Sequence, residues 1–247
     1  MALTSGNQIT LHYQPVLDLS SGQCRRAEAL VRWQHSTLGA IAPGDFIPAA
    51  ERTALMRPLT DLVLDLAVAQ LKRWQQEGIN LQLSVNISVR DLEDARFVES
   101  VRSLLSLHEV PASALELEVT EGALMTCPQT IVTHLEELRR LGISIALDDF
   151  GTGQSSLSYL AKLPADTLKL DRTFANDMKR SSRTAVAVRA VIDAWQPFRA
   201  ESHSSRKQAS RRQIRAHAAG RALRWLPGAH LRKSASCRLI FGKAGKA

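Results

Sequence analysis

Cysteine is scarce in this 247-residue sequence, which contains three. Cys24, Cys127 and Cys237 are odd in number and far apart, which excludes a disulfide framework and a C-x-x-C metal or redox motif. The sequence also lacks an uncharged apolar run of about 18 residues, so we expect no membrane span. The first twenty residues lack the basic start and apolar stretch of a signal peptide. These absences predict a protein of the reducing cytoplasm without a membrane partner.

Three common catalytic motifs are absent as well. The sequence has no G-x-x-x-x-G-K-[ST] phosphate-binding loop, so an ATPase of that type is not supported. It has no G-x-S-x-G turn of a serine hydrolase and no H-E-x-x-H pair of a zinc protease. The composition is 45% hydrophobic and 23% charged, which indicates a globular chain and excludes collagen, coiled coil and wholesale disorder.

Basic residues are distributed unevenly along the chain. The formal net charge is +8, yet residues 1–194 carry 19 basic and 23 acidic side chains. Residues 195–247 carry 13 basic side chains and a single acid, Glu201. This second stretch is rich in Arg, Ser, Ala and His and shows no sustained amphipathic period. We therefore interpret residues 1–194 as a domain and residues 195–247 as a basic tail that we expect to be poorly ordered.

Strand and helix signals alternate through residues 1–194. The predicted strands are 9–14, 25–33, 83–87, 115–119, 143–147 and 167–170. Apolar residues at helical spacing predict helices at 59–69, 97–105, 131–138, 155–161 and 174–193, and Gly78 and Gly142 follow two of them as stop signals. Ser20-Ser21-Gly22 predicts a hairpin turn between the first two strands. The later alternation predicts parallel β-α units, hence a doubly wound sheet or a (β/α) barrel.

Polar residues lie at or near the ends of the predicted strands. In both folds the active site lies at the carboxyl ends of the parallel strands. Asn86, Glu118, Asp148 and Asp149 occur there, and with Glu28 they form a set of hard oxygen donors that suits Mg²⁺ or Mn²⁺ better than zinc. Two adjacent aspartates can hold two cations, which predicts phosphodiester chemistry. Convergence of several strand ends on one face favours the barrel.

Each of these residues alone has a simpler interpretation. Glu116 and Glu118 could form the solvent-facing side of an alternating strand. Asp148 and Asp149, which precede a glycine-rich stretch, could be only a turn and the start of a helix. Lys169 lies between two leucines in a short strand. If the leucines face the surrounding helices, its ammonium points into the barrel mouth, where it needs anionic partners.

Seven motifs between about residue 8 and residue 194 carry a family resemblance in their order and spacing. They are Tyr13-Gln14-Pro15, Glu28-Ala29-Leu30-Val31-Arg32, Pro43-Gly44-Asp45-Phe46-Ile47-Pro48, Val85-Asn86-Ile87-Ser88, Glu118-Val119-Thr120-Glu121, Asp148-Asp149-Phe150-Gly151-Thr152-Gly153 and Leu168-Lys169-Leu170-Asp171-Arg172. This pattern resembles the EAL domain, a barrel phosphodiesterase that linearises cyclic di-GMP to pGpG. The resemblance implies an α/β fold, a TIM-like (β/α) barrel.

The resemblance also implies a metal centre. By it, Glu28, Asn86, Glu118 and Asp148 would hold one Mg²⁺ or Mn²⁺. Asp148 would bridge to a second cation that Asp149 also holds.

The remaining roles follow from the same resemblance. Lys169 would orient or help to activate the attacking water, so Lys169 and the metal ligand Glu28 are the catalytic candidates. Gln14 and Arg32 would contact cyclic di-GMP, with the guanidinium suited to a phosphate. Glu121 would anchor the loop at 150–156, which in the family couples the site to a homodimer interface.

The family pattern ends before the chain does. EAL domains continue with a seventh strand that ends in a Glu-Gly-Val-Glu type motif and an eighth that precedes Gln-Gly-Tyr/Phe, and neither motif follows Asp193. Gln154 also replaces the aromatic residue usual after Gly153. We therefore expect an incomplete barrel that lacks strands seven and eight and has an incomplete second metal site. Because Arg, Ala, Ser and Gly dominate out-of-frame translation of GC-rich genes, we interpret the tail as a frameshift product.

Three functions stay open at this point. The first is a cyclic di-GMP phosphodiesterase domain that is inactive or strongly impaired. The second is a degenerate EAL module that binds a nucleotide or a protein partner without turnover. The third is nucleic-acid binding through the basic tail. We disfavour it because basic residues and aromatics are not interleaved there beyond Trp225.

Overall fold

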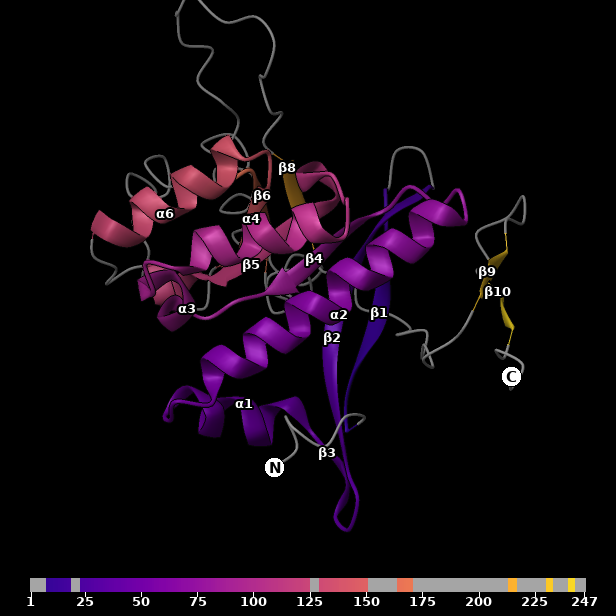
Figure 1. The fold of residues 1–247 in the computed structure, drawn as a ribbon, viewed down its shortest axis with the longest axis horizontal. Helices are drawn as coiled ribbons and strands as arrows, with labels where there is room; N and C mark the ends of the chain where they lie inside the picture. Colours follow the sequence, from indigo (N-terminus) through magenta and orange to yellow (C-terminus); the bar gives the residue numbers. More distant parts are fainter. Residues whose placement is uncertain are drawn as a thin grey trace, which may run out of the picture. The chain divides into compact units, whose positions relative to one another are not determined.

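The computed structural model describes residues 8–18, 23–124, 129–150 and 164–170, and three short strands of the tail (Figure 1). The predicted turn at 20–22 and the predicted helices at 155–161 and 174–193 lie outside the described residues. The chain divides into two compact units, one of residues 1–116 and 221–247 and one of residues 117–220. No helix in the described part is long and apolar enough to cross a membrane.

The strands of the first unit begin with a long antiparallel hairpin. β1 (Ile9–Leu17) pairs with β2 (Cys24–His35), and the short β3 (Gly39–Ile41) turns back to pair with the end of β2. β4 (Gln82–Asn86) lies parallel to β2. The three strands and the hairpin predicted from alternation in this part of the chain are therefore confirmed.

Helices cover the strands of the first unit. They are α1 (Pro43–Glu51), α2 (Met56–Gln76), α3 (Val89–Glu93) and α4 (Phe97–Leu107), followed by a 3-10 turn at Ala112–Ala114. α2 packs on β1 and β4, and the Trp74 ring meets the Tyr13 ring edge-on at 5.0 Å between centroids. The helix stops at Gly78, whose φ of 74° lets the Ile79 N–H donate to the Trp74 carbonyl at 2.8 Å.

β5 (Leu115–Thr120) runs from the first unit into the second. It is followed by α5 (Glu121–Leu124), α6 (Gln129–Arg140), β6 (Ser144–Phe150), β7 (Thr167–Leu170) and β8 (Gln213–Ala216). β6, β7 and β8 are parallel neighbours in that order. α6 buries Ile131, Leu135 and Leu138, the apolar stripe that predicted it. This parallel arrangement brings the carboxyl ends of the strands to one edge.

Tail residues extend the sheet of the second unit by one strand. The sequence placed the last strand at 167–170, whereas β8 pairs in parallel with it from within the basic tail. An edge strand presents unpaired backbone groups, and a short segment without a strong pattern of its own can satisfy them. β9 (His230–Arg232) and β10 (Ile240–Gly242) form a separate antiparallel pair.

Candidate functional site

Lys169 is the centre of a buried ionic cluster in the second unit. Its ammonium donates hydrogen bonds to Glu118 Oε2 at 2.7 Å and to Asp148 Oδ2 at 3.0 Å. The side chains of Lys169 and Glu118 are 5% and 1% exposed, so both charges are withdrawn from water. Such charges are tolerated when they are paired and hydrogen-bonded. The cluster supplies the anionic partners that an inward-pointing Lys169 requires.

Asp148 and Asp149 lie at a bulge near the end of β6. Leu147 pairs with Leu168 and Phe150 with Leu170, so β6 has one residue more than β7 in this interval. Asp149 accommodates the extra residue with a φ of 53°, a conformation that residues other than glycine adopt rarely. Its backbone N–H donates a hydrogen bond to Asp148 Oδ1 at 2.9 Å. Both aspartates belong to the strand, so the interpretation as only a turn and helix start is wrong.

Glu28 and Asn86 meet in the first unit. Glu28 is 6% exposed, and Asn86 Nδ2 donates to its Oε1 at 3.4 Å from the end of β4. Gln14 is the Cα partner of Glu28 across the hairpin, and Ser84 is its partner in β4. Three of the predicted site residues therefore occupy neighbouring strand positions in this unit.

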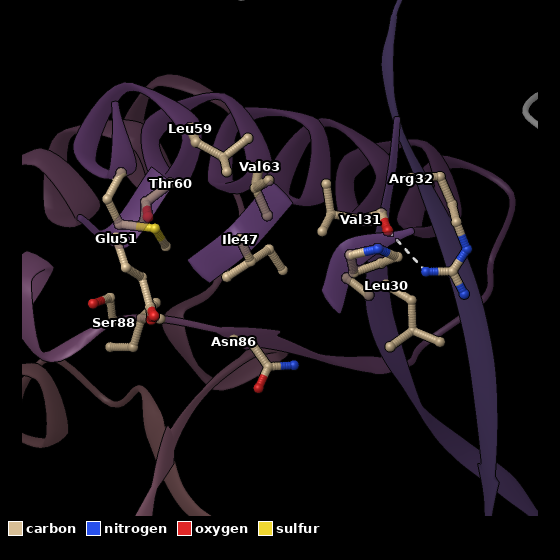
Figure 2. A pocket seen from close by; sticks show the side chains of 14 residues that line it. Leu30, Val31, Arg32, Ile47, Glu51, Leu59, Thr60, Val63, Asn86 and Ser88 are labelled. Atoms are coloured by element: carbon tan, nitrogen blue, oxygen red, sulfur yellow. Dashed lines mark hydrogen bonds between the residues drawn. The ribbon is translucent and has the colours of Figure 1, made fainter. Parts of the chain in front are cut away.

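A pocket of about 300 Å³ opens beside Asn86 in the first unit. Figure 2 shows Arg32 on one side of it, Glu51 and Ser88 on the other, and Asn86 between them. Apolar side chains of α2, among them Leu59 and Val63, form the opposite wall. The Arg32 guanidinium donates to its neighbour's backbone, the Val31 carbonyl, at 2.8 Å. Apolar walls with a few polar groups are typical of small-molecule pockets.

The sequence missed a second buried acid, Glu116. Its side chain accepts a hydrogen bond from Ser84 Oγ at 2.7 Å and lies 3.6 Å from Arg26 Nη1. Burial lowers the pKa of Arg26, and the nearby Glu116 carboxylate acts in the opposite direction. Since Glu116 and Glu118 are both buried, the interpretation of these residues as a solvent-facing strand side is wrong.

The remaining predicted residue, Glu121, is buried at the start of α5. The loop that it was predicted to anchor continues at 151–163, outside the described residues. Its anchoring role and the homodimer at that loop stay predictions.

Comparison with known proteins supports the family resemblance seen in the sequence. The family model of the EAL domain matches residues 1–202. The cyclic di-GMP phosphodiesterase PA2567 of Pseudomonas aeruginosa is 45% identical over 182 residues, which make up 74% of this chain and 31% of that protein. The chain spans less than a third of the length of the first curated relatives that it matches.

Solved structures show the same fold. The PaMucR phosphodiesterase, solved as a c-di-GMP complex, is 41% identical with a TM-score of 0.70 over 76% of each chain. The FimX EAL domain of Xanthomonas citri, solved in complex with c-diGMP, is 26% identical with a TM-score of 0.72 over 81% of each chain. These likenesses and the parallel sheet confirm the predicted TIM-like α/β barrel class, and the described strands are consistent with an incomplete barrel. The chain belongs to the EAL domain family.

Proposed function

We propose that this chain is a cyclic di-GMP phosphodiesterase domain that binds the nucleotide but converts it to pGpG very slowly or not at all. The observation that carries the proposal is the Glu118–Lys169–Asp148 cluster at the ends of parallel strands. The printed names of the relatives, which act on or bind cyclic di-GMP, support the substrate.

The donor set fits Mg²⁺ or Mn²⁺. Carboxylate oxygens of Glu118 and Asp148 lie within 4.8 Å of each other, and such hard oxygens are the preferred ligands of both ions. We assign Glu28 and Asn86 to the same cation as Glu118 and Asp148, and Asp149 to a second one. A bound cation supplies Lewis acidity and lowers the pKa of a coordinated water.

We assign the orientation of the water and the contacts with the nucleotide to side chains of this chain. Lys169 holds Glu118 and Asp148 in fixed positions, and we assign its ammonium the role of orienting a water near them. We assign phosphate contacts to Arg32, whose planar fork of donors matches phosphate oxygens, and a further nucleotide contact to Gln14. The pocket beside Arg32 and Asn86 offers apolar walls for a flat base.

We expect slow hydrolysis because the part of the chain that follows β7 lacks a metal ligand. β8 has the sequence Gln-Ile-Arg-Ala and contains no carboxylate. The family resemblance places a glutamate ligand at the end of the family's seventh strand, and the tail lacks that motif, so we expect the second cation to lack one donor. Loss of one preorganised electrostatic contribution costs on the order of a hundredfold to a thousandfold in rate.

Two measurements on the full chain test the proposal. Calorimetry with cyclic di-GMP and Mn²⁺ is expected to show binding that Arg32→Ala weakens and that Arg90→Ala, a change at an exposed arginine of α3, leaves unchanged. Chromatography of the same mixture is expected to show little or no pGpG. Rapid pGpG formation that Glu28→Ala abolishes would contradict the impairment, and absence of nucleotide binding would contradict the substrate.

A further inference from the structure

Two polar side chains of the first unit lie two strand positions before candidate metal ligands. Arg26 precedes Glu28 in β2, and Ser84 precedes Asn86 in β4, each by two residues. Residues two apart in a strand share a face of the sheet and lie about 6.6 Å apart along the strand. Arg26 is therefore on the same face as Glu28, at a distance that an arginine side chain can span.

Glu116 contacts both of these side chains from β5. Ser84 Oγ donates a hydrogen bond to Glu116 Oε1 at 2.7 Å, and Arg26 Nη1 lies 3.6 Å from Glu116 Oε2. The Glu116 side chain is 1% exposed, so water screens its attraction to the guanidinium only weakly. Among the described residues, Arg26 Nη1 is buried without a hydrogen-bond partner. The charge of Glu116 thus holds this end of the guanidinium, without help from a hydrogen bond of Nη1.

The place of the Arg26 guanidinium matters for Glu28. A positive charge on the same strand face opposes the approach of a divalent cation to the Glu28 carboxylate. A guanidinium can also pair with that carboxylate itself, because its donors match a carboxylate in geometry. The Glu116 carboxylate prevents both effects, since it offsets the charge of Arg26 and draws the guanidinium toward β5.

We propose that Glu116 is a positioning residue for the metal site, which keeps the Arg26 guanidinium away from Glu28 so that Glu28 can bind a divalent cation. This inference rests on the proposed metal site. It gives a function to a buried acid to which the family resemblance assigns none.

Calorimetric titration of the full chain with Mn²⁺, without nucleotide, tests the role of Glu116. Glu116→Gln keeps an acceptor for Ser84 and removes the charge, and we expect it to bind Mn²⁺ about tenfold more weakly than the unmodified chain. Arg26→Met leaves the Glu116 carboxylate without its cation, and we expect it to bind about threefold more tightly. The double variant loses both charges and should bind within about twofold of the unmodified chain. A merely structural role of Glu116 would not give this recovery, because the second substitution would add to the damage of the first.

Asp166→Asn is the matched control. Asp166 pairs with Arg139 at 2.7 Å, and its side chain is 13% exposed, so this variant also removes a carboxylate from a partly buried arginine pair. Asp166 precedes the start of β7, whereas the candidate ligands lie toward the carboxyl ends of their strands. We therefore expect Asp166→Asn to bind Mn²⁺ like the unmodified chain.

Each outcome decides the matter. If Glu116→Gln binds like the unmodified chain, or if the double variant binds as weakly as Glu116→Gln, the inference is wrong and the metal site stands. If Asp166→Asn loses as much affinity as Glu116→Gln, the effect is one of overall charge and the inference is wrong. If the unmodified chain does not bind Mn²⁺, or if Glu28→Ala binds it equally well, the metal site itself fails and takes the inference with it. Circular dichroism checks the fold. If Glu116→Gln does not fold, Arg26→Met decides alone, and a lack of tighter binding overturns the inference.

Discussion

At the scale of single residues, Asp91 shows how burial sets the behaviour of a carboxylate outside the candidate site. Its Oδ2 accepts hydrogen bonds from Thr60 Oγ1 and from the Ser88 N–H, both at 2.9 Å, which connects α3 to α2. Burial raises the pKa of Asp91, and these hydrogen bonds act in the opposite direction. A raised pKa in the folded state means that protonation favours folding. The stabilisation is complete below the unfolded pKa of about 3.9 and is lost as the pH rises through the folded pKa.

Asp91→Asn should remove this pH dependence, because the amide keeps an acceptor oxygen and has no charge. Urea unfolding between about pH 4 and pH 7 is expected to show the unmodified chain losing stability relative to Asp91→Asn as the pH rises. Asp91→Ala should cost about 1–3 kcal/mol, since Thr60 and the Ser88 N–H lose their acceptor. Identical pH profiles for the unmodified chain and Asp91→Asn would contradict the raised pKa.

Asp94→Asn is the control with the opposite sign. Hydrogen bonds from Arg96 lower the pKa of Asp94, so its contribution is present above the unfolded pKa and is lost as the pH falls. The unmodified chain should therefore lose stability relative to Asp94→Asn on acidification.

Residue environments were harder to predict than residue positions. Alternation in β5 predicted the strand, but it did not reveal that Glu116 and Glu118 are buried, because both faces of a strand in a parallel barrel are covered. Their partners Ser84 and Lys169 lie 32 and 51 residues away in sequence, beyond any local pattern. The sequence predicted oxygen donors at strand ends because the carboxyl ends of parallel strands meet at one edge of a sheet.

At the scale of elements, long periodic segments were predictable and short ones were not. α2 and α6 bury the apolar stripes that predicted them, and Gly78 and Gly142 end them as expected. α3 has five residues and β3 has three, too few to show a period. α1 contains Pro48, a residue that argues against a helix interior. β8 forms where β7 offers a free edge, which no feature of its own sequence indicates.

The end of α2 offers a test of this element-scale interpretation. Gly78 has φ of 74°, and a Cβ there would meet no atom within 4 Å, so a side chain is penalised by backbone conformation alone. Gly78→Ala is expected to destabilise the chain by about 1–2 kcal/mol, the cost of the left-handed conformation. The measurement is the free energy of unfolding in urea.

Gly122→Ala is the matched control for Gly78→Ala. Gly122 lies in α5 at negative φ and has the same open surroundings, so alanine there should stabilise the chain by about 0.4–1 kcal/mol. Equal effects of the two substitutions would show that conformation at Gly78 does not end the helix.

At the scale of the whole molecule, we expect the tail to determine both the closure of the barrel and its catalytic activity. A barrel has no free edges only when its last strand pairs with its first. The described tail supplies β8 beside β7, and its other two strands pair with each other. The family motifs that would complete the metal site do not occur in the tail. We therefore expect the present tail to reduce both stability and catalysis. A continuation that carries the missing motifs should recover both.

A change of reading frame after codon 194 tests that coupling. We expect one of the other two frames of the nucleotide sequence to encode Glu-Gly-Val-Glu and Gln-Gly-Tyr/Phe, and we expect the chain with that continuation to unfold in one steep transition. It should also form pGpG at least about a hundredfold faster, because the missing ligand returns. Circular dichroism in urea and chromatography of pGpG measure the two effects, and Glu28→Ala in the restored chain should abolish the second alone. A steep transition in the present chain, with no gain in pGpG on restoration, would show that the tail does not replace strands seven and eight of the barrel.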